Sequence, residues 1–354
     1  MTGRVTGLIA AGLLCFLAPL GADAANPACG ATISGAVTLT GNMNCTAVKK
    51  HGLTLTSGTT LDCAGFSILG PDGAVANGVQ TGRFGVYASN KTGITIKNCT
   101  VTDYDRGLYF SNVSNSVVNH SRFHGNTRFG ASVAGSGSFG VLFDACTFEG
   151  NGDEGLHFGG PFNNGAANPN RVTHSVAANN LAEGFYLLNA NNVELDMNTA
   201  SGNTAGLYVK QSPNVVVSHL TVIGDYVHLY GNSDGGRYSW ISITGGRLKL
   251  QKDTGTNGVP SANTFDHVCV SYDTASAAPD SAYYFEGVTS GANQFTNSAA
   301  KLVAGKTHVT AIASSTGNIM SSLYIQPAAL RTSIDGTSSF ASLTTQSTSP
   351  PLCY

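Results

Sequence analysis

Charged side chains are scarce in this sequence of 354 residues. Asp, Glu, Lys and Arg make up 11% of it, and the formal net charge is −2. A protein that binds nucleic acid needs a basic stripe or face to neutralise phosphates, and the sequence has none. An acidic ligand must therefore be held by a local cluster of basic residues, because the overall charge does not attract it.

Long apolar runs are also missing, except near the start. Residues 1–24 have the three parts of an export signal: the basic Arg4, an apolar stretch over 7–20, and an Ala-x-Ala cleavage site at 22–24. The apolar stretch is too short to act as a membrane anchor. We therefore predict no membrane span, and a mature protein that is secreted or periplasmic.

What the sequence has in abundance is glycine, with 44 residues, and a short repeat within residues 78–231. A Gly is followed by an apolar, a larger and another apolar residue, and the Gly-to-Gly spacings are 22, 23, 25, 29 and 22. A period in the low twenties indicates a solenoid, and the alternation inside each copy is that of a strand. The copies begin at Gly85, Gly107, Gly130, Gly155, Gly184 and Gly206, and a seventh without Gly begins at Tyr226.

Two further short apolar runs lie between successive copies. Examples are 93–96 and 192–195 for the second run, and 99–101 for the third. Three strands in each coil of about 23 residues predict an all-β fold, a parallel β-helix whose coils pair ~4.8 Å apart. A leucine-rich repeat would show Leu-x-x-Leu-x-Leu, which is absent, and a β-sandwich would not keep this spacing.

We expect one elongated domain. Residues 25–77 are predicted to form the N-terminal cap and first coils, residues 78–304 the β-helix, and residues 305–354 a C-terminal cap and tail. The coil after Gly155 is longer than its neighbours, and its extra Gly/Pro/Asn segment at 159–170 is predicted to wall a groove.

Seven cysteines follow the export signal, and their spacing fits no zinc site. Export favours disulfides, and we expect Cys29 to pair with Cys45 at the N-terminus. Cys63, Cys99 and Cys146 occupy similar places at the end of the second run, so a Cys63–Cys99 bond is expected as well. The odd number leaves at least one free thiol, unless another chain pairs with it.

The repeated Gly-apolar-x-apolar pattern, together with Leu53-Thr-Leu and the segment 60–70, resembles the right-handed parallel β-helix superfamily over about residues 30–300. The resemblance implies a single-stranded, right-handed helix with pectate/alginate lyase-like and mannuronan C5-epimerase-like repeats. Members also include polygalacturonase-like hydrolases, phage tailspikes and non-catalytic accessory proteins. The Asp-Pro-His-Asp, Gly-His-Gly and nonapeptide calcium motifs of particular subfamilies are absent.

In each copy the residue between the two apolar ones points outward. Stacked coils then place aromatic and charged residues in one strip, which we interpret as a polysaccharide groove, because sugars stack on aromatic rings and uronates pair with Arg or Lys. The alternative is that tyrosines there reflect β-propensity and stacking between coils. The strip residues predicted to bind substrate are Tyr87, Tyr109, Arg106, Tyr208, His228 and Tyr230.

The chemistry expected first is β-elimination or C5-epimerisation of a uronate, which begins with removal of the proton next to the carboxyl group. His157 and Tyr186 lie on adjacent coils and are the predicted base and acid, with Asp153 holding the imidazole. Arg106, Arg128 or Lys210 would neutralise the sugar carboxylate. This combination of residue types resembles the site of extracellular mannuronan epimerases and some alginate lyases.

Three alternatives remain open. Asp153, Glu154 and Glu183 could act as the carboxyl pair of a glycoside hydrolase. They could instead cap turns and pair with Arg106 or Arg128. The protein could also be a non-catalytic carbohydrate-binding or envelope accessory protein. No cofactor is expected, although Asp153 and Glu154 could ligate Ca²⁺.

A set of asparagines recurs three or four residues before the glycines of the repeat. We interpret it as a structural stack along the helix axis, because asparagine side chains bind the backbone of turns. The set comprises Asn126, Asn151, Asn180 and Asn203.

Overall fold

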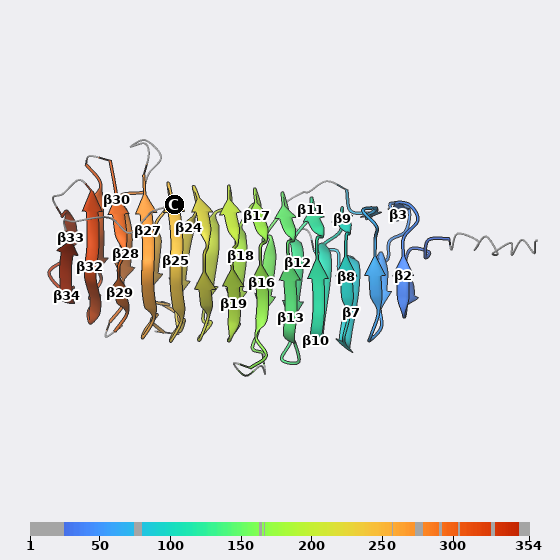
Figure 1. Cartoon of the computed structure of the whole chain (residues 1–354), viewed down its shortest axis with the longest axis horizontal. Coiled ribbons are helices and arrows are strands. Elements are labelled where there is room, and N and C mark those ends of the chain that lie inside the picture. Colours follow the sequence, from blue (N-terminus) through green and yellow to red (C-terminus); the bar gives the residue numbers. More distant parts are fainter. Residues whose placement is uncertain are drawn as a thin grey trace, which may run out of the picture.

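The computed structural model describes residues 25–73, 80–162, 165, 167–256, 258–272, 279–289, 292–303, 305–326 and 330–346. These residues form 34 strands and no helix, stacked into about 12 coils of about 24 residues (Figure 1). The predicted β-solenoid is therefore confirmed. The predicted export signal lies outside the described residues, and no helix in the described part is long and apolar enough to cross a membrane.

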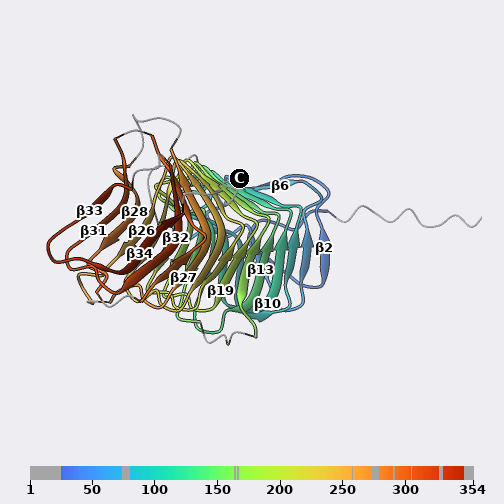
Figure 2. The same cartoon turned by 60° about the vertical axis from the view of Figure 1, so that its left-hand side comes forward.

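Every strand pair is parallel, and the coils present three faces (Figures 1 and 2). The first face is made of β1 (Ala31–Ile33), β4 (Leu53–Leu55), β7 (Phe84–Thr92), the first part of β10 (Arg106–Asn119), β12 (Phe129–Ala134), β15 (Leu156–Gly159), β18 (Glu183–Leu188), β21 (Ala205–Lys210), β24 (Tyr226–Tyr230), β26 (Leu248–Gln251), β28 (Ser281–Glu286), β31 (Thr307–Ile312) and β33 (Thr332–Ile334).

The second face follows the first in each coil, and its strands β10, β13, β19 and β27 mark one row along the solenoid in Figure 2, with other strands of the face between them. It is made of β2 (Ala36–Thr38), β5 (Thr60–Asp62), β8 (Thr95–Lys97), the second part of β10, β13 (Phe139–Asp144), β16 (Asn170–Thr173), β19 (Val193–Asp196), β22 (Val216–Ser218), the first parts of β25 (Arg237–Thr244) and β27 (Thr264–Ser271), β29 (Gln294–Thr296), β32 (Asn318–Gln326) and β34 (Phe340–Gln346).

The third face closes each coil with short strands. It is made of β3 (Met43–Asn44), β6 (Ser67–Leu69), β9 (Thr100–Thr102), β11 (Arg122–His124), β14 (Thr147–Glu149), β17 (Val176–Ala178), β20 (Thr199–Ser201), β23 (Thr221–Ile223), the second parts of β25, β27 and β32, and β30 (Ala299–Lys301).

The repeated glycines of the first face are explained by close contact between coils. A Cβ added to Gly107 would lie 2.6 Å from the carbonyl oxygen of Gly130 and 2.9 Å from Nδ2 of Asn126. Gly130 is in the same position with respect to Gly155 and Asn151. Only glycine allows this approach, and at Gly85 and Gly206 the close neighbours are the apolar side chains of Val101 and Val222 instead of an asparagine.

The predicted asparagine stack is confirmed. Nδ2 of Asn126 donates to Oδ1 of Asn151 over 3.0 Å, and the same bond runs from Asn151 to Asn180 and from Asn180 to Asn203 over 2.9 Å. The stack ends where Asn203 donates to Asp225 over 2.8 Å. Oδ1 of Asn151, Asn180 and Asn203 also accepts the backbone N–H of the preceding asparagine, and that of Asn126 accepts the N–H of Tyr104, so these buried turns have polar groups satisfied.

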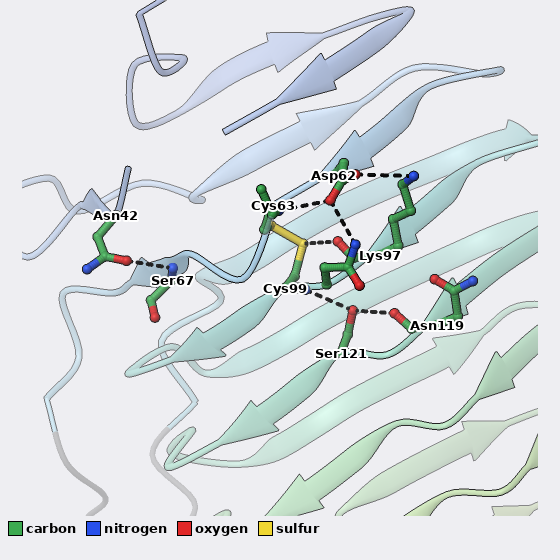
Figure 3. Close-up of a disulfide and its surroundings, with 10 residues drawn as sticks. Asn42, Asp62, Cys63, Ser67, Lys97, Cys99, Asn119 and Ser121 are labelled. Atoms are coloured by element: carbon green, nitrogen blue, oxygen red, sulfur yellow. Dashed lines mark hydrogen bonds and ion pairs between the residues drawn. A yellow bond between two sulfur atoms is a disulfide. The ribbon is translucent and has the colours of Figure 1, made fainter. Parts of the chain in front are cut away.

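Both expected disulfides are present. Cys29 is bonded to Cys45, and Cys63 is bonded to Cys99 (Figure 3). Ser121 continues the column of Cys99 on the next coil and accepts the N–H of Cys99 over 3.1 Å. Cys146 lies one coil further, beyond bonding reach of Cys99, and its thiol is free and buried. The expected free thiol is therefore found in the described residues.

Residues 167–169 of the long loop lie away from the predicted strip. Ala167, Asn168 and Pro169 border depressions over the second face, which Arg171 and Glu194 also line. Residues 167–169 thus do not wall the strip on the first face, whereas Gly159, the first residue of the predicted segment, lies on β15 beside His157.

Candidate active site on the first face

The outward row on the first face has the predicted register. Direct strand pairing connects Tyr87, Tyr109, Ser132, His157, Tyr186, Tyr208 and His228 in this order. Their apolar neighbours on either side, such as Leu156 and Phe158, are fully buried. The predicted strip therefore exists as a continuous column of paired residues, within which Ser132 is buried. The row also continues beyond His228 to Lys249 and Tyr284.

The rings of this row stack on one another from coil to coil. Tyr186 and Tyr208 have centroids 5.3 Å apart at 25°, and Tyr208 and His228 have centroids 4.6 Å apart at 6°. Tyr87 and Tyr109 stack in the same way at 5.8 Å. The ring faces are therefore covered by rings of the neighbouring coils, as the alternative interpretation of the tyrosines expects. Ring edges and hydroxyl groups are what this row offers to a ligand.

This stacking is interrupted at Ser132, which has no ring, and at His157 on the next coil. The ring of His157 is stacked on Phe129 at 4.8 Å and meets Tyr186 edge-on, at 5.1 Å and 83°. The predicted contact between His157 and Tyr186 is thus present. Burial raises the pKa of Tyr186 above its ordinary value, and the nearby Tyr208 adds to the shift.

The carboxylate beside the imidazole is Glu154, and this corrects the expectation for Asp153. Oε1 of Glu154 lies 3.6 Å from Nδ1 of His157. The other oxygen, Oε2, is buried. Asp153 comes one position earlier in the turn, and the charges of Glu154 and His157 both act on its carboxyl group.

Three carboxyl groups gather at this interruption. Burial and the charge of Glu154 raise the pKa of Glu183 to about 7 and that of Asp153 to about 6. Within the described residues, neither Glu154 nor Glu183 has an Arg or Lys within ion-pair distance. The alternative of ordinary surface ion pairs with Arg106 or Arg128 is therefore wrong for these two acids.

The two arginines instead share the buried carboxylate of Asp105. Nε of Arg106 and Nη1 of Arg128 lie 3.9 and 3.8 Å from its Oδ1. The Arg106 guanidinium lies 4.3 Å from the ring centroid of Tyr109, and that of Arg128 lies 4.4 Å from the centroid of Phe129. Burial and the neighbouring Arg128 lower the pKa of Arg106. Two cations and one anion leave a net positive charge at this end of the strip.

Lys210 lies on the second outward row, where it pairs with Leu188 and Tyr230 in register. Its Nζ is 5.5 Å from the ring centroid of Tyr230, whose hydroxyl donates to Asp253 over 3.1 Å. Burial, together with Lys249, lowers the pKa of His228 to about 3, so this imidazole is neutral at neutral pH.

Sequence reasoning missed four residues of this surface. The segment that begins at Arg247 has the apolar alternation of a strand, and extending the outward row through it would have found Arg247 and Lys249. Tyr284 and Asp253 follow irregular loops and carry no such signal. The described residues contain no group of three or more His, Cys, Asp or Glu that could hold a metal ion, so calcium at Asp153 and Glu154 stays a hypothesis.

The fold has counterparts among known proteins. The family model described as "Right handed beta helix region" matches residues 64–224. The described coils have the fold that this model describes, a parallel β-helix. No curated protein matches its sequence. Among solved structures, it resembles the catalytic domain of GH87 α-1,3-glucanase in complex with nigerose, with a TM-score of 0.53 and 12% identity over 88% of this chain and 62% of that chain.

Two further solved structures are similar to this β-helix at lower scores. The mannuronan C-5 epimerase AlgE6 A-module of Azotobacter vinelandii has a TM-score of 0.45 and 14% identity, over 87% of this chain and 73% of that chain. The Dettilon tailspike protein has a TM-score of 0.44 and 14% identity, over 86% and 60%. At 12% identity the likeness to the glucanase shows the fold alone, and the chain spans about three fifths of the length of the glucanase domain.

Proposed function

We propose that this protein is an exported polysaccharide hydrolase whose active site is the carboxyl cluster of Asp153, Glu154 and Glu183. The observation that carries the proposal is the placement of Glu154 and Glu183 at matching positions of adjacent coils, with Asp153 beside them; the pKa of Glu183, raised to about 7 by burial and by Glu154, agrees with it. A carboxyl group that keeps its proton near neutral pH can act as a general acid. The two disulfides agree with export, because such bonds persist in oxidising compartments.

The three acids take different roles. Glu183 gives its proton to the glycosidic oxygen as the bond to the anomeric carbon breaks. Asp153, whose pKa is about 6, is largely ionised at pH 7 and takes a proton from the water that attacks that carbon. Glu154 is the more enclosed carboxylate, and its charge raises the pKa of both neighbours. Hydrolysis then leaves one new reducing end for each bond cleaved.

The centre suits a neutral sugar better than a uronate. A uronate carboxylate placed there would face three carboxyl groups, whereas elimination or epimerisation requires a cation at that place. The raised pKa of Tyr186 also makes its hydroxyl a weak proton donor. Uronate elimination by His157 and Tyr186 remains the second candidate, because their rings are in contact at 5.1 Å.

The test is product analysis with the full chain. Purified protein is incubated with neutral and uronate polysaccharides, while reducing ends and absorbance of unsaturated uronates are both measured. We expect reducing ends without absorbance, and loss of this activity in Glu183→Gln and Asp153→Asn. The control Glu149→Gln removes an exposed carboxylate on the third face and should leave the rate unchanged.

Two outcomes contradict hydrolysis. Absorbance that requires His157 and Tyr186 would establish elimination. Binding without any product from any polymer would favour a carbohydrate-binding protein. Reducing ends that persist in Glu183→Gln would show that the acid has been assigned to the wrong residue.

A further inference from the structure

A second basic and aromatic cluster lies on the first face, beyond the predicted strip. Lys249 pairs in register with His228 and with Tyr284, so it continues the outward row. Arg247 precedes the same strand and reaches the column of Tyr226, since its carbonyl oxygen accepts the N–H of Val227. From Glu183 this column passes Ala205 and Tyr226 before Arg247. Three coil steps of ~4.8 Å place Arg247 roughly 14 Å from the column position of Glu183.

Aromatic rings hold the Arg247 side chain in place. Its guanidinium carbon lies 4.8 Å from the ring centroid of Tyr226 and 4.9 Å from that of Tyr284. Its Nε is buried. In the part of the chain that the structure describes, the guanidinium has no carboxylate and no hydrogen-bond acceptor. A positioned guanidinium of this kind can accept a carboxylate or sulfate without losing an existing ion pair.

Lys249 adds a second cation to the cluster. Its Nζ lies 5.4 Å from the ring centroid of Tyr284 and 3.3 Å from Oε2 of Glu286. The neighbouring His228 is neutral at neutral pH, because burial and Lys249 lower its pKa to about 3. Arg247 and Lys249 carry two positive charges, and Glu286 carries one negative charge. The cluster therefore has a net positive charge and attracts an anion.

We propose that Arg247, Lys249 and Tyr284 form a subsite for an acidic group of the polysaccharide, three coils beyond the carboxyl cluster. This proposal depends on the proposed function in one respect: both require a polysaccharide to lie along this strip. Arg106 and Arg128, which share Asp105, carry net positive charge on the other side of the carboxyl cluster. The strip is thus basic, acidic and basic in turn. The substrate it fits carries acidic groups on sugars away from the bond that is cleaved.

The probe for this subsite is heparin, a highly acidic polysaccharide whose binding does not require cleavage. Affinity of the full chain for heparin is measured at pH 7 over a series of salt concentrations. We expect binding despite the net charge of −2. In Arg247→Gln and Lys249→Gln, the slope of log affinity against log salt should fall by about one for each cation that no longer pairs with a sulfate group. Glu286→Gln removes the competing carboxylate and should bind more tightly than wild type.

Arg122→Gln is the matched control, because it removes one positive charge from an exposed ion pair on the third face. Its heparin affinity and salt slope should equal those of the wild type. The proposal is overturned if the wild type does not bind heparin, or if Lys249→Gln and Glu286→Gln both behave like the control. The midpoint of thermal unfolding verifies that Arg247→Gln folds. Lys249→Gln and Glu286→Gln test the subsite independently of the Arg247 variant. Heparin binding that depends on Arg247 without hydrolysis of any polymer would leave the subsite standing and refute the hydrolase.

Discussion

The imidazole of His157 and the carboxylate of Glu154 face each other across 3.6 Å, in the part of the strip where Ser132 and His157 interrupt the coil-to-coil ring stacking. Phe129 covers the other side of the imidazole. The contact keeps Glu154 next to Asp153 and Glu183, whose pKa values its charge raises. The chemistry of the site therefore depends on a residue that is itself almost enclosed.

The pH dependence of hydrolysis follows from these two shifts. We expect kcat/KM to fall above about pH 7, because Glu183 loses the proton that it must donate, and to fall below about pH 6, because Asp153 gains a proton. Glu154→Gln removes one negative charge, lowers the pKa of Glu183 and moves the alkaline limb to lower pH. Rates measured from pH 4 to 9 test this, and an alkaline limb unmoved in Glu154→Gln would contradict the role of its charge.

Hydrolysis and elimination differ in their need for Tyr186. If Glu183 is the acid, the activity of Tyr186→Phe should stay within about tenfold of the wild-type activity, because the ring and its stacking on Tyr208 are kept. If Tyr186 is the proton donor, the same variant should lose about 10²–10⁴-fold. Initial rates on the best polymer decide between them, with Tyr208→Phe as the control for loss of a neighbouring hydroxyl.

The asparagine stack should contribute strongly to stability. Asn151 accepts the side-chain and backbone N–H groups of Asn126 and donates to Asn180 and to the carbonyl oxygen of Phe123. Asn151→Ala leaves several of these buried groups without partners, at a cost of about 3 kcal/mol. Urea unfolding should show this loss, whereas Gln294→Ala, an exposed amide on β29, should change stability by less than about 0.5 kcal/mol. Equal effects of the two variants would refute a structural role for the stack.

The thiol of Cys146 should be inert in the folded protein. Burial raises its pKa to about 12, so almost no thiolate is present at pH 8. A thiol-specific reagent should react with Cys146 only after denaturation, and at the rate of unfolding. Rapid labelling of Cys146 in the native state, located by mass spectrometry of the labelled peptide, would contradict the enclosed position.

The outward row and the asparagine stack could be predicted because each depends on a short periodic pattern. The direction of a side chain in a turn does not follow from periodicity, which is why the sequence suggests Asp153 where Glu154 lies. Ring stacking between Tyr186 and Tyr208 depends on side-chain torsions that no spacing encodes. Arg247 and Lys249 were missed because the glycine of the repeat is lost after Gly206 and the following loops vary in length.

The asparagine stack and the later asparagines support different edges of the β-helix. The stack runs along the corner between the third and first faces and ends where the carboxylate of Asp225 accepts hydrogen bonds from Asn203. Asn263, Asn293 and Asn318 bond to one another along the corner between the first and second faces. The coils that carry Glu183 and those beyond Arg247 are therefore braced along two separate edges rather than by one continuous line of amides.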